Sequence, residues 1–254
     1  RSCLVGSEMC IRDRFSPENP WRFNFLDYEM RRPGGGAGLT ENLVNLFTTV
    51  LESADQASGK SKGEDYWNRA LKQLLRNVVD LLKIAKGTVS LPEMYDIVVS
   101  APMSADDLQS EQWRDSSACY QCIREAETKA RGTSSERDFD MVLRYWLKEF
   151  PHLAEKTRSI IVSSFTGMAD GLVRGPMYEL FCTTTNLVPE MTHEGAIVVV
   201  NLPVKEYSEV GQAAQVIWKY LWQRATERRD VTAHPKVTML LSLIHISEPT
   251  RQDR

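Results

Sequence analysis

Apolar residues recur at helical spacing over most of the chain between Thr40 and Leu172. The clearest stripe runs from Trp67 to Ala85 and predicts a helix over Glu64–Lys86, which Gly87 ends. Further helices are expected from Thr40 to Leu51, from the capping box at Ser90 and Glu93 to Val99, from Ser104 to Ala126, from Ser135 to Phe150, and over Leu153–Leu172.

A different pattern follows near the end of the chain. Ala196–Val200 is a continuous apolar run rich in β-branched residues, which is typical of a strand buried on both faces of a parallel sheet. Asn201-Leu202-Pro203 breaks the run, and a helix of about twenty residues is expected next. A second strand is predicted over Lys236–Leu241. Strand, turn and long helix form half of a βαβ unit.

Two glycine- and proline-containing stretches mark candidate boundaries. Arg31–Gly38 is predicted to be a flexible connector, and Arg174-Gly175-Pro176 is the second boundary. Before the connector, Trp21, Phe23 and Phe25 alternate as in a short strand or extended segment. After the second boundary, Tyr178–Cys182 is expected to be a short strand. The sequence therefore predicts an α/β protein that is mostly helical, with an all-α block between pieces of a parallel sheet.

The two ends look foreign to the rest of the chain. Residues 1–14 and 242–254 have no period and resemble the translated sequencing-adapter strings that border metagenomic gene fragments. Ordinary disordered termini are the alternative. On this interpretation the native piece is Phe15–Leu241, one large domain or two small ones.

Composition and charge argue against only a few classes of protein. The formal net charge is −3, which gives no compositional case for a nucleic-acid or anionic-membrane binder. Three of the five cysteines lie in Phe15–Leu241, and this odd, small number favours a reducing compartment. No apolar run approaches the eighteen or so residues that span a bilayer.

Candidate motifs for chemistry are weak. Gly59-Lys60-Ser61 looks like the end of a phosphate-binding loop, but Ala54 stands where the leading Gly is required, and the tripeptide follows a helix instead of a strand. Cys119-x-x-Cys122 lies on the apolar side of a predicted helix, where core cysteines are more common than a redox pair or half a zinc site. Cys182 is also expected in the core.

Other polar residues give no assembled site. The spacing of His152, His193 and His234 does not suggest a shared site. Thr183–Asn186 could contact a ligand, but a turn is the preferred interpretation. Lys156 with Arg158, or Lys60 with Lys62, could contact phosphates, but residues 38–158 hold 16 basic and 19 acidic residues, which favours a solvated surface. No catalytic, cofactor-binding or metal-binding residue is therefore assigned.

Several phrases of the chain, taken in order, have the character of one family. They are Phe23–Glu29 with the Gly-rich connector, Tyr66–Ala70 with Gln73–Asn77, Tyr145–Pro151, Lys156–Ser159, and Ala196–Val200 with Asn201-Leu202-Pro203. Together they resemble the coupling proteins of type IV secretion, conjugative DNA-pumping ATPases of the TraG/TraD kind. The resemblance covers Phe15–Leu241, although Phe25 stands where the family usually has Pro.

The resemblance implies a RecA-like P-loop NTPase sheet with a large all-α domain inserted at residues 38–172. Residues 15–37 and 173–241 would belong to the nucleotide-binding domain. The phosphate-binding loop (Walker A) would precede Phe15, and Lys236–Leu241 would be the Walker B strand without its acidic residues. The chain is then expected to be an inactive fragment that holds no cofactor, whereas the parent would use ATP and Mg²⁺.

The parent would act as a homo-hexamer that moves single-stranded DNA, with relaxosome proteins and secretion-channel components as partners. It would work on the cytoplasmic side of the bacterial inner membrane, associated with that membrane. Two alternatives stay open: a related hexameric P-loop translocase for duplex DNA or protein export, and a non-enzymatic adaptor that binds protein through Gly38–Leu172.

Overall fold

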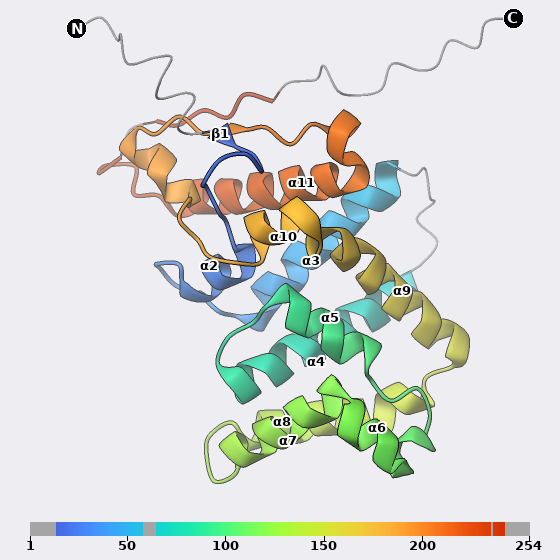
Figure 1. Cartoon of the computed structure of the whole chain (residues 1–254). Helices are drawn as coiled ribbons and strands as arrows, with labels where there is room; N and C mark the ends of the chain where they lie inside the picture. Colours follow the sequence, from blue (N-terminus) through green and yellow to red (C-terminus); the bar gives the residue numbers. More distant parts are fainter. Residues whose placement is uncertain (1–13, 58–64, 235, 242–254) are drawn as a thin grey trace, which may run out of the picture. The chain divides into compact units, whose positions relative to one another are not determined.

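The computed structural model describes residues 14–57, 65–234 and 236–241 (Figure 1). The candidate phosphate loop Gly59-Lys60-Ser61 and nearly all of the two adapter-like ends lie outside these residues; Arg14 is the exception. Contacts divide the chain into two units. The helical unit comprises residues 22–185, and the split unit comprises residues up to 21 together with residues from 186 onward.

Among its described residues the helical unit contains helices, turns and loops, together with an isolated β-bridge between Phe23 and Thr185. The elements are α2 (Phe25–Arg31), α3 (Thr40–Ala57), α4 (Asp65–Lys86), α5 (Leu91–Val99), η1 (Asp107–Gln109), α6 (Glu111–Ser116), α7 (Ala118–Ala130), α8 (Glu136–Arg144), the π-helix η2 (Tyr145–Glu149), η3 (Phe150–His152), α9 (Glu155–Leu172) and α10 (Gly175–Phe181). The prediction of a mostly helical protein is confirmed.

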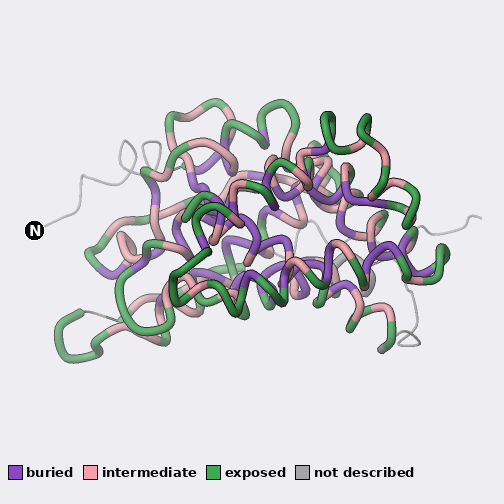
Figure 2. Tube along the Cα trace, turned by 90° about the horizontal axis from the view of Figure 1, so that it is seen from below, coloured by how far each residue is buried: buried purple, intermediate pink, exposed green. Residues whose placement is uncertain are grey.

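Helix α4 is the centre of this unit. It contacts α3, α5, α7, α8 and α9, and its predicted apolar stripe is fully buried over most of its length. The residues with no exposed surface are Leu74, Leu75, Val78, Val79, Leu81, Leu82 and Ala85. Each large aliphatic side chain removed from water contributes about 1.5–3 kcal/mol. In Figure 2 the buried stretches alternate with exposed ones along the helices, as amphipathic packing requires.

The predicted N-cap at Ser90 is confirmed, but Glu93 reaches back to the Ser90 hydroxyl instead of to the Ser90 N–H that a full capping box uses. The Ser90 hydroxyl accepts the Glu93 N–H at 3.4 Å and donates to the Glu93 carboxylate at 2.6 Å. Pro92 lies in the first turn, where it costs no helical hydrogen bond.

The single helix predicted from Ser104 to Ala126 is wrong. The chain forms η1, α6 and α7 instead, and α6 ends at Ser117, whose N–H donates to Trp113 O at 2.8 Å. The Ser117 hydroxyl then caps α7 by accepting the Tyr120 N–H at 3.1 Å, and it donates to Ser100 O at 2.7 Å. A serine that ends one helix and starts the next explains the break.

Two other predicted elements change type. The helix expected to reach Phe150 leaves α-helical geometry at Tyr145 and continues as η2 and η3 up to His152. The short strand expected at Tyr178–Cys182 is wrong, because this segment belongs to α10. Its buried residues Met177, Leu180 and Phe181 have helical spacing. The ring of Phe181 packs edge-on against that of Phe25, with ring centroids 6.3 Å apart.

The Gly-rich connector is held in place instead of being a flexible link. Arg32 forms a buried ion pair with Glu29 at 2.9 Å, and its guanidinium also donates to Gly35 O at 3.3 Å. Asn42 donates to Gly36 O at 2.7 Å. Gly34 and Gly36 have φ of +90° and +76°, which only glycine adopts readily. The connector therefore lies within the helical unit. This unit begins at residue 22 and not at residue 38, where the sequence predicts the domain boundary.

The split unit is built from two segments far apart in sequence. Its elements are β1 (Arg14–Phe15), η4 (Pro189–Glu194), β2 (Val199–Val200) and α11 (Val204–Arg228). β1 and β2 pair in parallel, with Phe15 opposite Val200. Phe15 is fully buried and stacks on Trp218 of α11, with ring centroids 5.8 Å apart. The predicted long helix is thus confirmed as α11.

The predicted strands of this unit are largely wrong. Only Val199 and Val200 of the Ala196–Val200 run are in a strand, and Ile197 and Val199 are 55% and 39% exposed, so the run is not buried on both faces. The Ala196 N–H bonds to Met191 O at 3.1 Å, which ties the start of the run to η4. Lys236–Leu241 has no strand, and Leu240 is 91% exposed. Among the described residues β2 pairs with β1 alone. No further strand covers Ile197 and Val199, and their side chains stay exposed.

We expect Ser117→Ala to lower the free energy of unfolding by about 1–3 kcal/mol, because it removes the α7 cap and leaves Ser100 O with one donor fewer. The matched control is Ser110→Ala, which removes only the α6 cap to the Trp113 N–H and should cost less. Urea unfolding followed by circular dichroism measures both. Equal losses would contradict the double role of Ser117.

Two glycine substitutions should have opposite effects. A Cβ on Gly211 would lie 2.8 Å from the Tyr207 Cβ and 3.2 Å from Leu202 O, so Gly211→Ala should destabilise the split unit by about 1–3 kcal/mol. A Cβ on Gly167 in α9 meets nothing within 4 Å, so Gly167→Ala should stabilise by up to about 1 kcal/mol. Thermal unfolding distinguishes the two. A stabilising Gly211→Ala would show that the close approach is absent.

Candidate functional site

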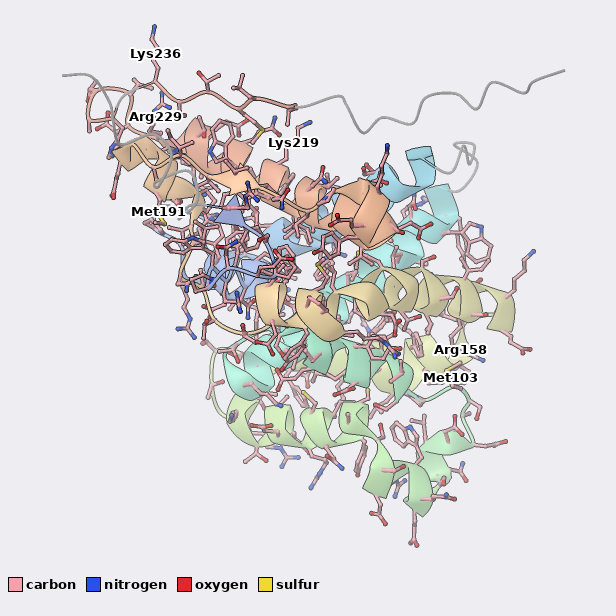
Figure 3. All side chains as sticks on the ribbon, turned by 45° about the horizontal axis from the view of Figure 1, so that its top comes forward. Met103, Arg158, Met191, Lys219, Arg229 and Lys236 are labelled. Atoms are coloured by element: carbon pink, nitrogen blue, oxygen red, sulfur yellow. The ribbon has the colours of Figure 1, made fainter. Side chains whose placement is uncertain are left out.

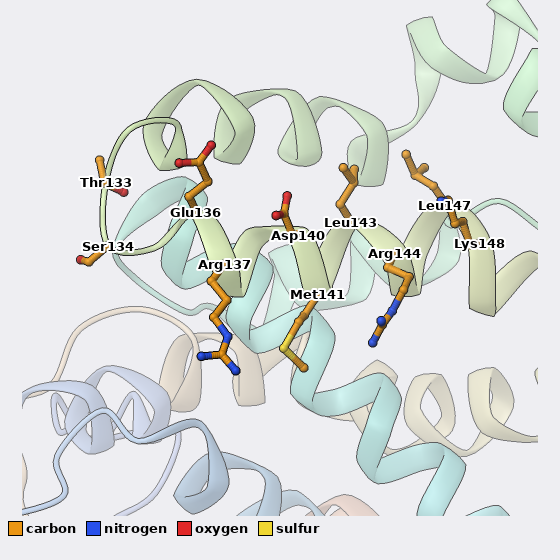
Figure 4. Close-up of a pocket in the computed structure, with 10 residues that line it drawn as sticks. All are labelled: Thr133, Ser134, Glu136, Arg137, Asp140, Met141, Leu143, Arg144, Leu147 and Lys148. Carbon is orange, nitrogen blue, oxygen red and sulfur yellow. The ribbon is translucent and has the colours of Figure 1, made fainter.

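Two surface hollows of the helical unit flank α8. The α4–α8 groove has a volume of about 610 Å³ and is lined by Arg69, Lys72, Gln73, Arg76, Asn77, Asp80, Asp138, Met141, Val142, Arg144, Tyr145 and Glu149. A second hollow, of about 850 Å³, lies along α8 itself (Figure 4). In that view Arg137, Met141 and Arg144 point to one side of α8, and Asp140 and Leu143 to the other.

Charges in the α4–α8 groove are mixed and mostly paired. Arg76 contacts Glu41 at 2.6 Å, and this hydrogen bond lowers the pKa of the Glu41 carboxyl. Arg144 contacts Glu149 at 3.1 Å. Burial raises the pKa of Asp80 above its ordinary value, while the hydrogen bond from Thr40 opposes that shift. A groove that pairs its own charges has little net attraction for a polyanion.

The π-helix η2 borders the groove and shapes it. Trp146 is fully buried and donates from its indole N–H to Asn77 O of α4 at 3.4 Å. Tyr145 is 3% exposed, its hydroxyl has no hydrogen-bond partner, and burial raises its pKa. Short π-helical segments are often found at functional sites. The residues that line the groove include no Ser, Thr, Cys or His.

The two cysteines of the C-x-x-C pair lie in the core of the helical unit. Cys119 is fully buried and Cys122 is 5% exposed, both on the inner side of α7. Burial raises the pKa of both thiols, that of Cys122 to about 12. A thiol held protonated is a poor nucleophile and a poor metal ligand. The prediction of core cysteines is confirmed for this pair.

The polar run at Thr183–Asn186 joins the two ends of the helical unit. The Asn24 side chain donates to Thr183 O at 3.0 Å, and the Asn24 N–H donates to the Thr185 hydroxyl at 3.1 Å. Phe23 and Thr185 form an isolated antiparallel bridge. These contacts give the threonines a structural role.

The histidines are only partly brought together. His193 and His234, in the split unit, have ring centroids 6.1 Å apart, which sequence spacing did not indicate. His152 lies in η3 and its Nδ1 is 2.6 Å from Lys148 O. Within the described residues, no group of three His, Cys, Asp or Glu side chains could hold a metal ion.

The basic pair Lys156 and Arg158 divides into an exposed and a buried residue. Lys156 is exposed, whereas Arg158 is 8% exposed and donates from Nη1 to Pro151 O and Leu153 O, both at 3.1 Å. Sequence reasoning placed both on a solvated surface and missed the burial of Arg158. The helical periodicity of α9, which puts residues 157, 158, 161 and 165 on one buried face, could have indicated it.

Comparison of the chain with protein-family models, curated proteins and solved structures finds no match. Across the part of the chain that the structure describes, no helix combines the length and the apolar character needed to cross a membrane.

We expect acid to weaken the split unit through His193, which is 4% exposed and has an unpartnered Nε2. Burial lowers its pKa, Arg229 and His234 lower it further, and Glu190 and Glu194 oppose this. The unfolded state therefore takes up the proton first, and stability falls as the pH drops through about 6.5.

Urea unfolding between pH 8 and pH 5 measures this effect. His193→Phe should flatten the slope near pH 6.5, whereas His152→Ala, at an exposed position, should leave it unchanged. An unaltered slope in His193→Phe would contradict the assignment.

Proposed function

We propose that the chain is part of an ATP-driven DNA-transfer motor, a conjugative coupling ATPase of the type IV secretion class. The observation that carries the proposal is the parallel pairing of Phe15 with Val200, because the whole helical unit, residues 22–185, lies between them in the sequence. Parallel strands need a crossover connection, and here the connection is a whole helical domain. This is the arrangement that the ordered family phrases imply.

The local contacts give several of those phrases a structural reason. Asn24 caps α2 and bonds to the threonine run, Trp146 anchors η2 to α4, and Arg158 holds the turn before α9. These are positions at which a substitution disturbs the junctions of the helical unit. These residues of the family phrases therefore have structural roles in the helical unit.

In this proposal the split unit is part of a RecA-like nucleotide-binding domain. The Walker A Lys and the Walker B acids, which hold ATP and Mg²⁺, would come from other parts of the parent protein. The parent would form a homo-hexamer at the cytoplasmic face of the bacterial inner membrane. Single-stranded DNA, relaxosome proteins and the secretion channel would be its partners, and the helical unit would face the DNA or the relaxosome.

A protein-binding adaptor is the second candidate, and the grooves beside α8 favour it. Met141 lines both hollows and is 54% exposed. The paired charges around it suit a protein partner better than a polyanionic one such as DNA. A translocase for duplex DNA or protein export shares the architecture of the first candidate and differs only in substrate.

The complete gene tests the proposal. We expect it to encode, ahead of Phe15, a buried strand followed by G-x-x-x-x-G-K-S/T, and an acidic pair soon after Leu241. A polar loop in place of the acidic pair, with no phosphate-binding loop upstream, would favour the adaptor.

The 254-residue chain should show no ATP hydrolysis by itself, because its sequence contains no complete G-x-x-x-x-G-K-S/T. A coupled phosphate-release assay measures this, with an intact P-loop ATPase as the positive control. Sustained turnover by the purified chain would contradict the assignment of the nucleotide groups to other parts of the parent.

A further inference from the structure

The charges that α4 contributes to the α4–α8 groove are sorted along the helix. The basic residues Arg69, Lys72 and Arg76 come first, and the acidic residue Asp80 follows one turn later. At a rise of 1.5 Å per residue, Arg69 and Asp80 lie about 16 Å apart along the helix axis. This wall of the groove is therefore basic at one end and acidic at the other.

The opposite wall, formed by α8 and η2, runs antiparallel to α4. Burial raises the pKa of the Asp80 carboxyl, and the negative charge of Asp138 on α8 raises it as well. Farther along this wall, Glu149 accepts a hydrogen bond from Gln73 of α4 at 2.9 Å. Asp80 and Asp138 therefore share the acidic end of the groove, and Asp138 takes part in no ion pair among the described residues.

The other end of the groove is basic although Glu149 lies there. Glu149 is paired with Arg144 at 3.1 Å, and Arg76 is paired with Glu41 of α3 at 2.6 Å. Lys72 takes part in no ion pair in the part of the chain that the structure describes. This end can therefore offer a cation to an acidic partner without breaking an existing pair.

Apolar surface lies between the two charged ends. Met141 and Val142 of α8 line the groove, and Met141 is 54% exposed. A methionine side chain adapts readily to the shape of an apolar partner. The buried cation Arg158, which Figure 3 labels, does not line the groove, and its Nη1 donates to backbone carbonyl groups instead.

We propose that the α4–α8 groove binds a helical segment of a partner protein whose own charges are sorted in the opposite sense. The acidic end of this segment would meet Lys72 and Arg69. Its basic end would meet Asp80 and Asp138, and an apolar side chain between the ends would cover Met141. A groove between two antiparallel helices suits a third helix. The proposal rests on the second candidate function, protein binding beside α8, and adds the chemistry of the partner.

The sorted charges disfavour a ligand of a single sign. A polyanion such as DNA would place negative charge against Asp80 and Asp138 as well as against the basic end, and like charges repel. A uniformly basic segment would meet the same repulsion at Lys72. Lys83 and Arg137 follow or precede the two acids in sequence but do not line the groove. A segment with both signs about 16 Å apart matches both ends at once.

Two synthetic peptides of identical composition test the proposal. Both are Ala-based amphipathic helices of about 16 residues. The sorted peptide has Glu in its first turns, Lys in its last turns and Leu at helical spacing between them, whereas the interleaved peptide alternates Glu and Lys. We expect the full chain to bind the sorted peptide about tenfold more tightly in fluorescence anisotropy. In ¹H–¹⁵N NMR the saturable shifts should be confined to the residues that line the groove.

Variants of the full chain locate the contacts of the sorted peptide. Lys72→Glu and Asp138→Asn should each weaken its binding by about two- to fivefold, because each removes one surface ion pair. Met141→Glu should weaken it by about tenfold or more, because the apolar contact is lost. The matched control is Lys205→Glu, which makes the same charge change at an exposed position of the split unit and should leave the affinity unchanged. Circular dichroism checks that each variant is folded.

Each contrary result has a distinct meaning. Equal affinity for the two peptides would overturn the sorted-charge proposal but would keep protein binding beside α8. No saturable shift with either peptide, or no loss of affinity in Met141→Glu, would also overturn the proposal. Tighter binding of a short oligothymidylate at the same residues would show that the groove takes a polyanion instead. None of these measurements involves ATP, so failure of the motor proposal would leave them unaffected.

Discussion

Burial of the α4 stripe is the interaction on which the helical unit depends. Leu74, Val78 and Leu81 have no exposed surface, and five other helices contact α4. Removing so wide an apolar face from water requires neighbours on several sides, so the surrounding helices converge on one axis. The serine-linked break precedes α7, which contacts α4, and the π-helix η2 is tied to α4 by the bond from Trp146 to Asn77 O.

The amphipathic helices were predictable from the sequence because their signal is local. Gly87 ends α4 and the Ser90 N-cap starts α5 where the pattern placed them. The break at Ser117 was missed because its hydroxyl is held by Ser100 O, seventeen residues earlier, which periodicity cannot register. α10 was misread as a strand because an apolar run of five residues suits either structure.

The sheet was predicted less well, for a related reason. A buried parallel strand depends on neighbours that are distant in sequence, and Val199 and Val200 pair only with Arg14 and Phe15. The candidate sites show the same limit. The sequence placed Cys119 and Cys122 in the core correctly, but the approach of His193 to His234 and the unpaired Nε of Arg158 arise from tertiary contacts that residue spacing does not contain.

Among the described residues, the helical unit offers surface hollows beside α8, and the split unit offers one parallel strand pair with a long helix. We propose that this arrangement belongs to a DNA-transfer motor. The most direct test is ATP hydrolysis by the parent protein, expressed from its complete gene, with and without single-stranded DNA. The account predicts hydrolysis that single-stranded DNA stimulates; a parent that neither binds nor hydrolyses ATP would contradict it.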